Sequence, residues 1–231
     1  MTRRPFHLVL LGQGKTGSVV AEVAQERGHR ITALTEDENL NGRWLTPENL
    51  GGVDAVIDFT TPDAVVANIA RCIAARISMV VGTTGWYGEI DRIKREVEQA
   101  GTGFIFGANF SYGVNLFLQI ALSAAPALQH GYLGHITETH HVHKKDAPSG
   151  TATALQRVVE QASGVPADIS SVREGDVMGI HTLELSSAGD RMFLTHEVKS
   201  RRTFAEGAVL AAEWIVGKTG FYDFKDIFSR L

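Results

Sequence analysis

The stretch FHLVLLGQGKTGSVVAEVAQERG, residues 6–28, decides the fold of the chain. Its apolar start, residues 6–11, is typical of a strand that is buried on both faces of a parallel sheet. Three glycines follow in the spacing G-x-G-x-x-G, and a helical pattern then covers residues 18–27 and stops at Gly28. A strand, this glycine turn and a helix in succession predict a unit that binds a dinucleotide.

Each glycine of the turn has its own physical reason. Gly12 permits a tight turn, Gly14 lets backbone N–H groups approach a pyrophosphate, and Gly17 lets the helix pack against the strand. The start of the helix adds partial positive charge where the phosphates bind. We therefore predict cofactor contacts along the whole turn, which consists of Gly12, Gln13, Gly14, Lys15, Thr16 and Gly17.

Two other interpretations of this turn are weaker. Gly14-Lys15-Thr16 imitates the end of a P-loop, but that motif requires a glycine where Val9 stands. A bare glycine turn without a ligand is the second alternative. It is disfavoured by Glu36, which ends a second predicted strand at residues 29–35. An acid at about this spacing hydrogen-bonds the hydroxyls of the adenosine ribose.

Glu36 also bears on the choice of cofactor. A carboxylate at this place repels a 2′-phosphate, so we predict that NADH is favoured over NADPH. The alternative is a solvated acidic loop, because Glu36, Asp37 and Glu38 follow one another in the sequence.

Predicted strands and helices alternate through the first half of the chain. Further strands are predicted at residues 53–59, 78–81 and 103–106, and helices at 64–75 and 88–100. This order predicts an α/β fold with an open parallel sheet, on which ligands bind at the carboxyl ends of the strands. Three loops at those ends are small or polar, at residues 12–17, 82–85 and 107–111.

After residue 110 the periodicity changes. The predicted elements are an apolar helix at 113–129, a strand at 135–141, a helix at 151–162, strands at 180–185 and 192–198, a helix at 204–216 and a tail at 221–231. This part is predicted to be a mixed α+β unit with an antiparallel component. The last helix is predicted to return to the first domain.

Composition narrows the classes of function. Of the 231 residues, 44% are hydrophobic and 21% charged, which is ordinary for a globular domain. A net charge of −4 gives no reason to expect nucleic-acid binding, and the apolar segment 114–128 is too short to span a bilayer. The single cysteine, Cys72, agrees with a reducing cytoplasm. We therefore expect a cytoplasmic protein without nucleic-acid or membrane partners.

A second motif, ETHHVHKKDAPSGTA at residues 138–152, concentrates groups that carry chemistry. His140, His141 and His143 raise the question of a metal, but the motif has no H-E-x-x-H pattern and no cysteine. On a strand, His141 and His143 would share one face and His140 would lie on the other. We therefore predict no metal site.

The same motif favours a site for carboxylates. Histidine and lysine together are cationic, and each charged hydrogen bond contributes roughly 1.5–3 kcal/mol. Ser149, Gly150 and Thr151 follow Pro148 at the predicted start of a helix, where N–H groups and hydroxyls bind an anion. A small dianionic substrate fits this arrangement. A histidine, or a lysine of lowered pKa, then donates a proton after hydride arrives.

Taken together, these motifs resemble the 4-hydroxy-tetrahydrodipicolinate reductases, formerly called dihydrodipicolinate reductases. The resemblance covers nearly the whole chain, and the pattern E-x-H-H-x-x-K-x-D-A-P-S-G-T-A is highly specific to that family. Beside the glycine turn and residues 138–152, it includes residues 58–60, 82–85, 108–111, 113–115, 173–176, 179–181, 196, 200–201 and 204–209.

The resemblance implies both a fold and an activity. It implies a Rossmann-type domain, formed by residues 1–110 and 205–231, and a mixed substrate and oligomerisation domain at 111–204, assembled as a homotetramer. The implied activity moves hydride from NADH or NADPH to a cyclic imine dicarboxylate. The product, tetrahydrodipicolinate, belongs to lysine and diaminopimelate biosynthesis.

Residue roles follow from the same resemblance. His140 would be the catalytic proton donor and Lys144 its acidic partner; which of them delivers the proton directly stays open, because neighbouring titratable groups act as a coupled pair. His141, Gly150 and Thr151 are the implied contacts of the substrate carboxylates. The implied dinucleotide contacts are the glycine turn, Glu36, Gly82, Thr84, Ala108, Asn109 and Phe110.

The chain departs from the family at the glycine turn. Arg-Met is common before the third glycine, and Lys15-Thr16 stand there instead. A lysine contacts a phosphate as a point charge and not as a fork, which leaves the cofactor preference open. Two alternatives of other classes remain, a dinucleotide-binding regulator without chemistry and a nicotinamide reductase for another dicarboxylate.

Overall fold

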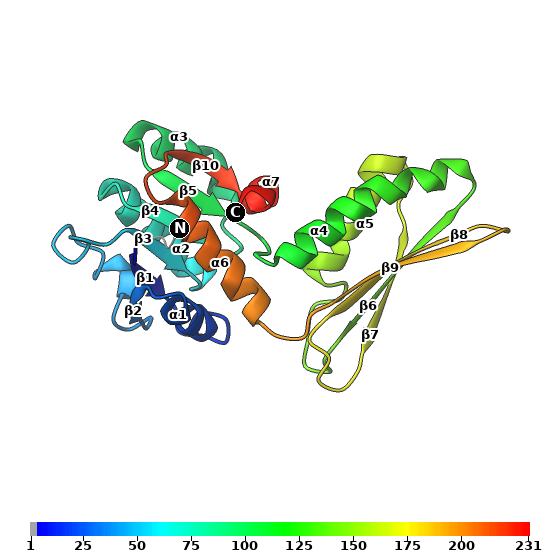
Figure 1. Ribbon diagram of the computed structural model, residues 1–231, viewed down its shortest axis with the longest axis horizontal. Helices are drawn as coiled ribbons and strands as arrows, with labels where there is room; N and C mark the ends of the chain where they lie inside the picture. The colour runs from blue at the N-terminus through cyan, green and yellow to red at the C-terminus, as the bar shows by residue number, and fades with distance from the viewer. Residues whose placement is uncertain (1–3) are drawn as a thin grey trace. The chain divides into compact units, whose positions relative to one another are not determined.

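The computed structural model describes residues 4–231, which form two compact units (Figure 1). The first unit runs to Ser111 and resumes at Arg201, and the second is Tyr112–Ser200. The boundaries expected from the sequence stood after residue 110 and before residue 205. Within residues 4–231, no helix is both long and apolar enough to cross a membrane.

The first unit is built on a six-stranded sheet in the order β10-β5-β4-β3-β1-β2, and all its paired strands are parallel. The strands are β1 (His7–Leu11), β2 (Arg30–Leu34), β3 (Ala55–Asp58), β4 (Ser78–Val81), β5 (Gly103–Phe106) and β10 (Gly220–Asp223). The open parallel sheet expected from the sequence is confirmed. The strand order changes direction at β1, which pairs with β2 on one side and β3 on the other.

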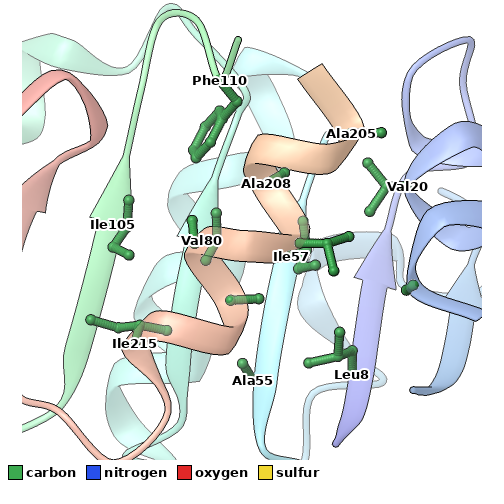
Figure 2. Packing of buried hydrophobic residues seen from close by; sticks show 14 of the residues in the cluster. Leu8, Val20, Ala55, Ile57, Val80, Ile105, Phe110, Ala205, Ala208 and Ile215 are labelled. Carbon is green, nitrogen blue, oxygen red and sulfur yellow. The ribbon is translucent and has the colours of Figure 1, made fainter. Parts of the chain in front are cut away.

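Helices cover both faces of this sheet. They are α1 (Gly17–Glu26), α2 (Pro62–Ala74), α3 (Ile90–Ala100), α6 (Arg202–Ile215) and α7 (Phe224–Ile227), with short 3-10 turns at Leu40–Gly42, Tyr87–Glu89 and Phe228–Arg230. On one face, alanines of α6 such as Ala205 and Ala208 pack against Ile57 and Val80 (Figure 2). On the other face, Val56 packs with residues of α2 and α3. Burial on both faces explains why these strands read as continuous apolar runs.

The second unit pairs a mixed sheet with two helices. Its strands β6 (Leu133–His140), β7 (Asp168–Arg173), β8 (Ile180–Ser186) and β9 (Arg191–Glu197) lie in the order β7-β6-β8-β9. β7 is parallel to β6, whereas β8 and β9 are antiparallel to their neighbours. The helices are α4 (Tyr112–Ala124) and α5 (Gly150–Ser163), with a 3-10 segment at Ala125–His130. The mixed α+β unit expected from the sequence is confirmed.

The structure corrects four local expectations. β10 forms part of a segment that was expected to be a tail, and β7 was not expected at all. The helix expected at 113–129 ends at Ala124 because Pro126, at the start of the 3-10 segment, lacks the N–H that would continue it. The strand expected at 135–141 ends at His140. His141 and His143 therefore lie in a loop, and not on the strand face opposite to that of His140.

Candidate active site

The glycine turn after β1 fits a dinucleotide. Gly12 has φ +89°, and a Cβ there would lie 2.3 Å from the carbonyl oxygen of Phe59. A Cβ on Gly17 would lie 2.0 Å from the carbonyl oxygen of Gly12, so α1 packs closely on the turn. A Cβ on Gly14 would meet no described atom within 4 Å, so the backbone is open to a ligand at that residue. The three glycines thus have the geometries of a pyrophosphate-binding turn.

Two pockets lie beside this turn, at the carboxyl ends of β1 and β3, where the strand order reverses. Ligands of open α/β sheets bind at such a switch point. Gly12, Glu36, Asn39 and Asp63 are among the residues that line one pocket. The other is lined by Gly14, Lys15, Thr16, Gly17, Phe59, Thr60, Pro62, Gly82, Thr83 and Thr84. Most of the cofactor residues expected from the sequence are therefore brought together here, while Gln13 is exposed and lines neither.

The loop after β5 holds the other three expected cofactor residues. Ala108 is exposed, and the side-chain oxygen of Asn109 accepts the N–H of Ser111 at 2.8 Å. Phe110 is 2% exposed, and its ring lies 4.6 Å from that of Phe224, measured between centroids. The side chain of Phe110 therefore belongs to the core.

Asp58, fully buried at the end of β3, ties the pocket loops together. Its carboxylate accepts the N–H and hydroxyl of Thr60 at 3.0 and 2.7 Å, the hydroxyl of Thr83 at 2.7 Å, and the amide of Asn68 at 2.8 Å. Burial raises the pKa of this carboxyl, and the hydrogen bonds oppose that rise. Asn68 in turn accepts from Asn39 at 2.9 Å. The loops after β2, β3 and β4 are thus held by one buried carboxylate.

In the second unit, His140 ends β6 and is 7% exposed. Its Nδ1 donates to Oε2 of Glu138, which is fully buried. Nη2 of Arg173 donates to Oε1 of Glu138 at 2.9 Å and to the carbonyl oxygen of Asp146 at 2.7 Å. Residues of β6, β7 and the following loop therefore form one charged network around the histidine.

The charges of this network set the pKa values of its members. Burial would raise the pKa of Glu138, but hydrogen bonds from Ser171, Arg173 and His140 outweigh it and hold the pKa below its ordinary value. The pKa of His140 is lowered, mainly by burial and further by the charges of Lys144 and Arg173, while Glu138 opposes the shift. Glu138 is therefore ionised at neutral pH, and His140 has the lowered pKa of a buried imidazole.

Lys144 lies in the loop after β6 and is engaged with that loop. Its Nζ donates to both carboxylate oxygens of Asp146, at 2.8 and 2.9 Å. Nε of Arg173 donates to the carbonyl oxygen of Lys144 at 3.3 Å. The partner of Lys144 in this structure is thus an aspartate, whereas His140 is bonded to Glu138.

Helix α5 begins where the sequence predicted an anion site. Ser149 is its N-cap, and the Ser149 hydroxyl oxygen accepts the N–H of Ala152 at 3.1 Å and lies 2.9 Å from Nε2 of His181. Gly150 and Thr151 form the first turn, where backbone N–H groups have no acceptor within the helix and are suited to bind an anion.

His181 on β8 was not expected from the sequence. It is 3% exposed, and its ring centroid lies 5.1 Å from that of His140. The Ser149 oxygen accepts the N–H of Ala152 and has a second lone pair, so its contact with Nε2 of His181 is compatible with either direction of donation. Nδ1 of His181 is a buried atom without a hydrogen-bond partner among residues 4–231. Burial is the main cause that lowers its pKa to about 4, so His181 is neutral.

One ligand atom each from Glu138, His140 and His181 lies within 4.8 Å of the others, a composition that a metal ion can use. The guanidinium of Arg173, 2.9 Å from Glu138, already supplies positive charge to this carboxylate. We therefore treat the three residues as a hydrogen-bonded acid–base cluster and assign no metal to it.

Comparison with known proteins decides the family. The sequence matches the family model "dihydrodipicolinate reductase, N-terminus" over residues 6–110 and "dihydrodipicolinate reductase, C-terminus" over residues 113–228. The chain belongs to the dihydrodipicolinate reductase family. It is therefore an oxidoreductase that uses NAD(P)H to reduce the cyclic imine 4-hydroxy-tetrahydrodipicolinate to tetrahydrodipicolinate in lysine and diaminopimelate biosynthesis.

Relatives in this family match over most of their length. The 4-hydroxy-tetrahydrodipicolinate reductase of Christiangramia forsetii is 36% identical over 98% of this chain and 99% of its own. That of Neisseria meningitidis serogroup B is 39% identical over 75% of this chain and 72% of its own. The dipicolinate-bound dihydrodipicolinate reductase from Paenisporosarcina sp. TG-14 has the same fold, with a TM-score of 0.79 at 21% identity over 97% of this chain and 100% of that one.

For a dihydrodipicolinate reductase, the two units supply the two parts that the reaction needs. NAD(P)H supplies hydride when bound, and the glycine turn and its pockets in the first unit fit that cofactor. In the second unit, the first turn of α5 has N–H groups suited to a carboxylate. The imidazole of His140 lies beside that of His181, which contacts the N-cap Ser149.

Sequence reasoning missed four residues around the reductase site: Asp58, Glu138, Arg173 and His181. All four lie within the segments that carried the family resemblance, but none stood out by chemistry. His181 alternates with Leu183 and Leu185 along β8, which made it look like an ordinary core position. Arg173 ends a polar edge strand that was not expected.

Proposed function

We propose that His140 is the proton donor of the reduction and that Lys144 is its cationic partner at the substrate. The observation that carries this proposal is the environment of the buried His140 ring. Its Nδ1 is bonded to Glu138, and this bond leaves Nε2 for proton transfer. Net reduction adds a hydride and a proton to the substrate. His140 gives the proton, becomes neutral and regains a proton from solvent.

We also propose that the substrate carboxylates bind Ser149, Gly150 and Thr151 at the N-terminus of α5, with His141 beside them. The Paenisporosarcina relative binds dipicolinate, which is a dicarboxylate. Two carboxylates need two cationic or N–H-rich contacts, and α5 supplies one of them. Lys144 supplies the other when it exchanges the carboxylate of Asp146 for that of the substrate.

For the cofactor we propose a preference for NADH. Glu36 and Asp63 both line the pocket next to Gly12, and two carboxylates there disfavour the 2′-phosphate of NADPH. The guanidinium of Arg43 donates to the backbone carbonyl oxygens of Asp37 and Glu38, so it is engaged with the loop itself. Lys15 lines the neighbouring pocket beside Gly14, where the pyrophosphate would bind, and the backbones of Ala108, Asn109 and Phe110 would contact the same cofactor.

We further propose a homotetramer that acts in the cytoplasm. In each copy, residues 1–110 and 205–231 would form the dinucleotide-binding domain, and residues 111–204 the substrate and oligomerisation domain. Large apolar side chains are exposed on the sheet of the second unit, among them Leu133 (76%), Phe193 (58%) and Met192 (42%). Exposed apolar residues that gather on one sheet favour contact between copies of the chain. Light scattering during gel filtration tests this, and a monomer at micromolar concentration would refute it.

The decisive assay mixes the protein with freshly made product of the preceding synthase and follows NADH and NADPH oxidation separately. We expect turnover with both cofactors and a higher kcat/KM with NADH. A strong preference for NADPH would overturn the role of Glu36. A substrate panel of other cyclic and open dicarboxylates separates this activity from reduction of a different dicarboxylate.

A further inference from the structure

We propose that Glu138 is a positioning residue that fixes the tautomer and orientation of His140, so that Nε2 is the atom that transfers the proton. This inference rests on the proposed role of His140 and deepens it. It assigns the proton to one nitrogen and gives a function to a buried acid that is two residues from the donor on the same strand.

The first argument concerns Nδ1 of His140. An ionised carboxylate has no hydrogen to donate, so the bond between this nitrogen and Glu138 requires an N–H on Nδ1. Arg173 and Ser171 both donate to Glu138, which favours its ionised form. Nδ1 therefore carries its proton in both charge states of His140, and the proton that comes and goes is the one on Nε2.

The second argument concerns Nε2. A Cβ placed on Gly179, just before β8, would lie 2.9 Å from Nε2 of His140 and 3.3 Å from its Cδ2. The carbonyl oxygen of Gly179 accepts the N–H of Val198 at 2.8 Å, so this backbone is fastened to the sheet. The ring thus lies between a carboxylate at one nitrogen and a bare glycine at the other. A larger residue at 179 would crowd Nε2 and displace the ring from its present position.

The third argument concerns charge. The groups that act on His140 are Glu138 on its own strand, Lys144 in the next loop, Arg173 on β7 and neutral His181 on β8. Lys144 and Arg173 disfavour its protonated form, and Glu138 favours it. Two further groups contact these neighbours of His140: Asp146, which pairs with Lys144, and His196 on β9, which is the strand partner of His181. Removing the charge of Glu138 therefore makes His140 a weaker base.

The test uses Glu138→Gln in the full-length protein. The carbonyl oxygen of the new amide turns to Arg173, and its NH2 group turns to His140, so Nδ1 becomes an acceptor and the neutral ring carries its proton on Nε2. Glu184→Gln is the matched control, because Glu184 is on the same sheet and pairs with Arg191 at the surface. Glu138→Asp keeps the charge and serves as the conservative rescue.

Two readouts separate this proposal from the proposed function. Histidine-labelled NMR without substrate reports which nitrogen of His140 loses its proton, with His140→Gln to assign the signal. We expect Nε2 in the wild type and Nδ1 to be unprotonated in neutral Glu138→Gln. We also expect kcat to fall by roughly 10²–10⁴, with KM for NADH unchanged and the alkaline limb of the pH profile shifted to lower pH.

An unchanged tautomer and pH limb in Glu138→Gln would overturn the positioning role, even in an active reductase. Loss of all turnover in the wild type with the cyclic imine would overturn the proposed function and leave the NMR result standing. Should thermal unfolding show that Glu138→Gln does not fold, Gly179→Ala is the second variant, because its added methyl group would crowd Nε2 of the same ring. It should lower kcat at constant KM for NADH, and wild-type kcat in this variant would refute the proposal.

Discussion

The hydroxyl oxygen of Ser149 lies 2.9 Å from Nε2 of His181 and, at 3.1 Å, accepts the backbone N–H of Ala152. A strand of the sheet thereby fixes the N-cap of the helix that is proposed to bind the substrate. The geometry of the proposed anion site therefore depends on this contact.

Replacing Ser149 with Ala should lower the free energy of unfolding by about 1 kcal/mol, because an N-cap is lost. It should also raise KM for the cyclic imine, since the first turn of α5 is no longer held by His181. Urea unfolding and steady-state kinetics measure the two effects. Ser163→Ala, at the other end of α5, is the control: its hydroxyl donates to Val159 and Val165, so stability should fall without a change in KM. An equal rise of KM in both variants would contradict the expectation.

Replacing His140 with Gln should lower kcat by roughly 10²–10⁴, because the proton donor is lost. Lys144→Ala should lower kcat and also raise KM for the substrate, since its charge pairs with a carboxylate. His143→Gln is a suitable control, because His143 lies in the same loop and is exposed. Wild-type turnover of either His140→Gln or Lys144→Ala would remove the corresponding role.

Replacing Glu36 with Ala should shrink the preference for NADH by improving kcat/KM for NADPH. The physical reason is the loss of one of two carboxylates, Glu36 and Asp63, that line the pocket beside Gly12 and would repel a 2′-phosphate. Asp37→Ala makes the same change of charge one residue later, outside the lining of that pocket, and should leave the ratio of the two cofactors nearly unchanged. A shift of equal size in both variants would show that general charge, and not position 36, sets the preference.

Stability should fall as the pH is lowered from about 6.5 toward 4. His181 has a folded-state pKa of about 4 against an ordinary value of 6.5, so below pH 6.5 the unfolded chain binds a proton that the folded chain refuses. The loss from this residue reaches about 3 kcal/mol at most and levels off below the folded pKa. The lowered pKa of Glu138 adds a loss in the same direction at acid pH.

Urea unfolding at a series of pH values between 7 and 4 tests this dependence. His181→Gln should flatten the fall, whatever its stability at neutral pH, while a change at exposed His143 should not. Parallel curves for the wild type and His181→Gln would contradict the assignment.

The parallel sheet was predictable because it is written in local patterns. β1 is apolar from Leu8 to Leu11 since both of its faces are buried, and a side chain at Gly12 or Gly17 would collide with the backbone of Phe59 or of Gly12. β7 and β10 gave no comparable signal. They are edge strands, and the polar residues of DISSVR are mostly exposed, so no apolar alternation marks them.

The site was predictable only in part for a related reason. Residues 138–152 are contiguous, so their chemistry could be inferred together. The contacts of Glu138 with Arg173 and of Ser149 with His181 join positions 35 and 32 residues apart. The pairing of β6 with β7 produces the first contact, and the packing of the start of α5 against β8 produces the second.

The buried carboxylate of Asp58 holds the loops of the cofactor pocket in place, so this residue is less tolerant of substitution than the exposed residues that line the pocket. Its donors come from Thr60, Thr83 and Asn68, and these hold the loops from beneath, whereas Glu36 stands on the rim. An engineer who wishes to exchange one nicotinamide cofactor for the other can therefore vary the rim and leave this foundation untouched.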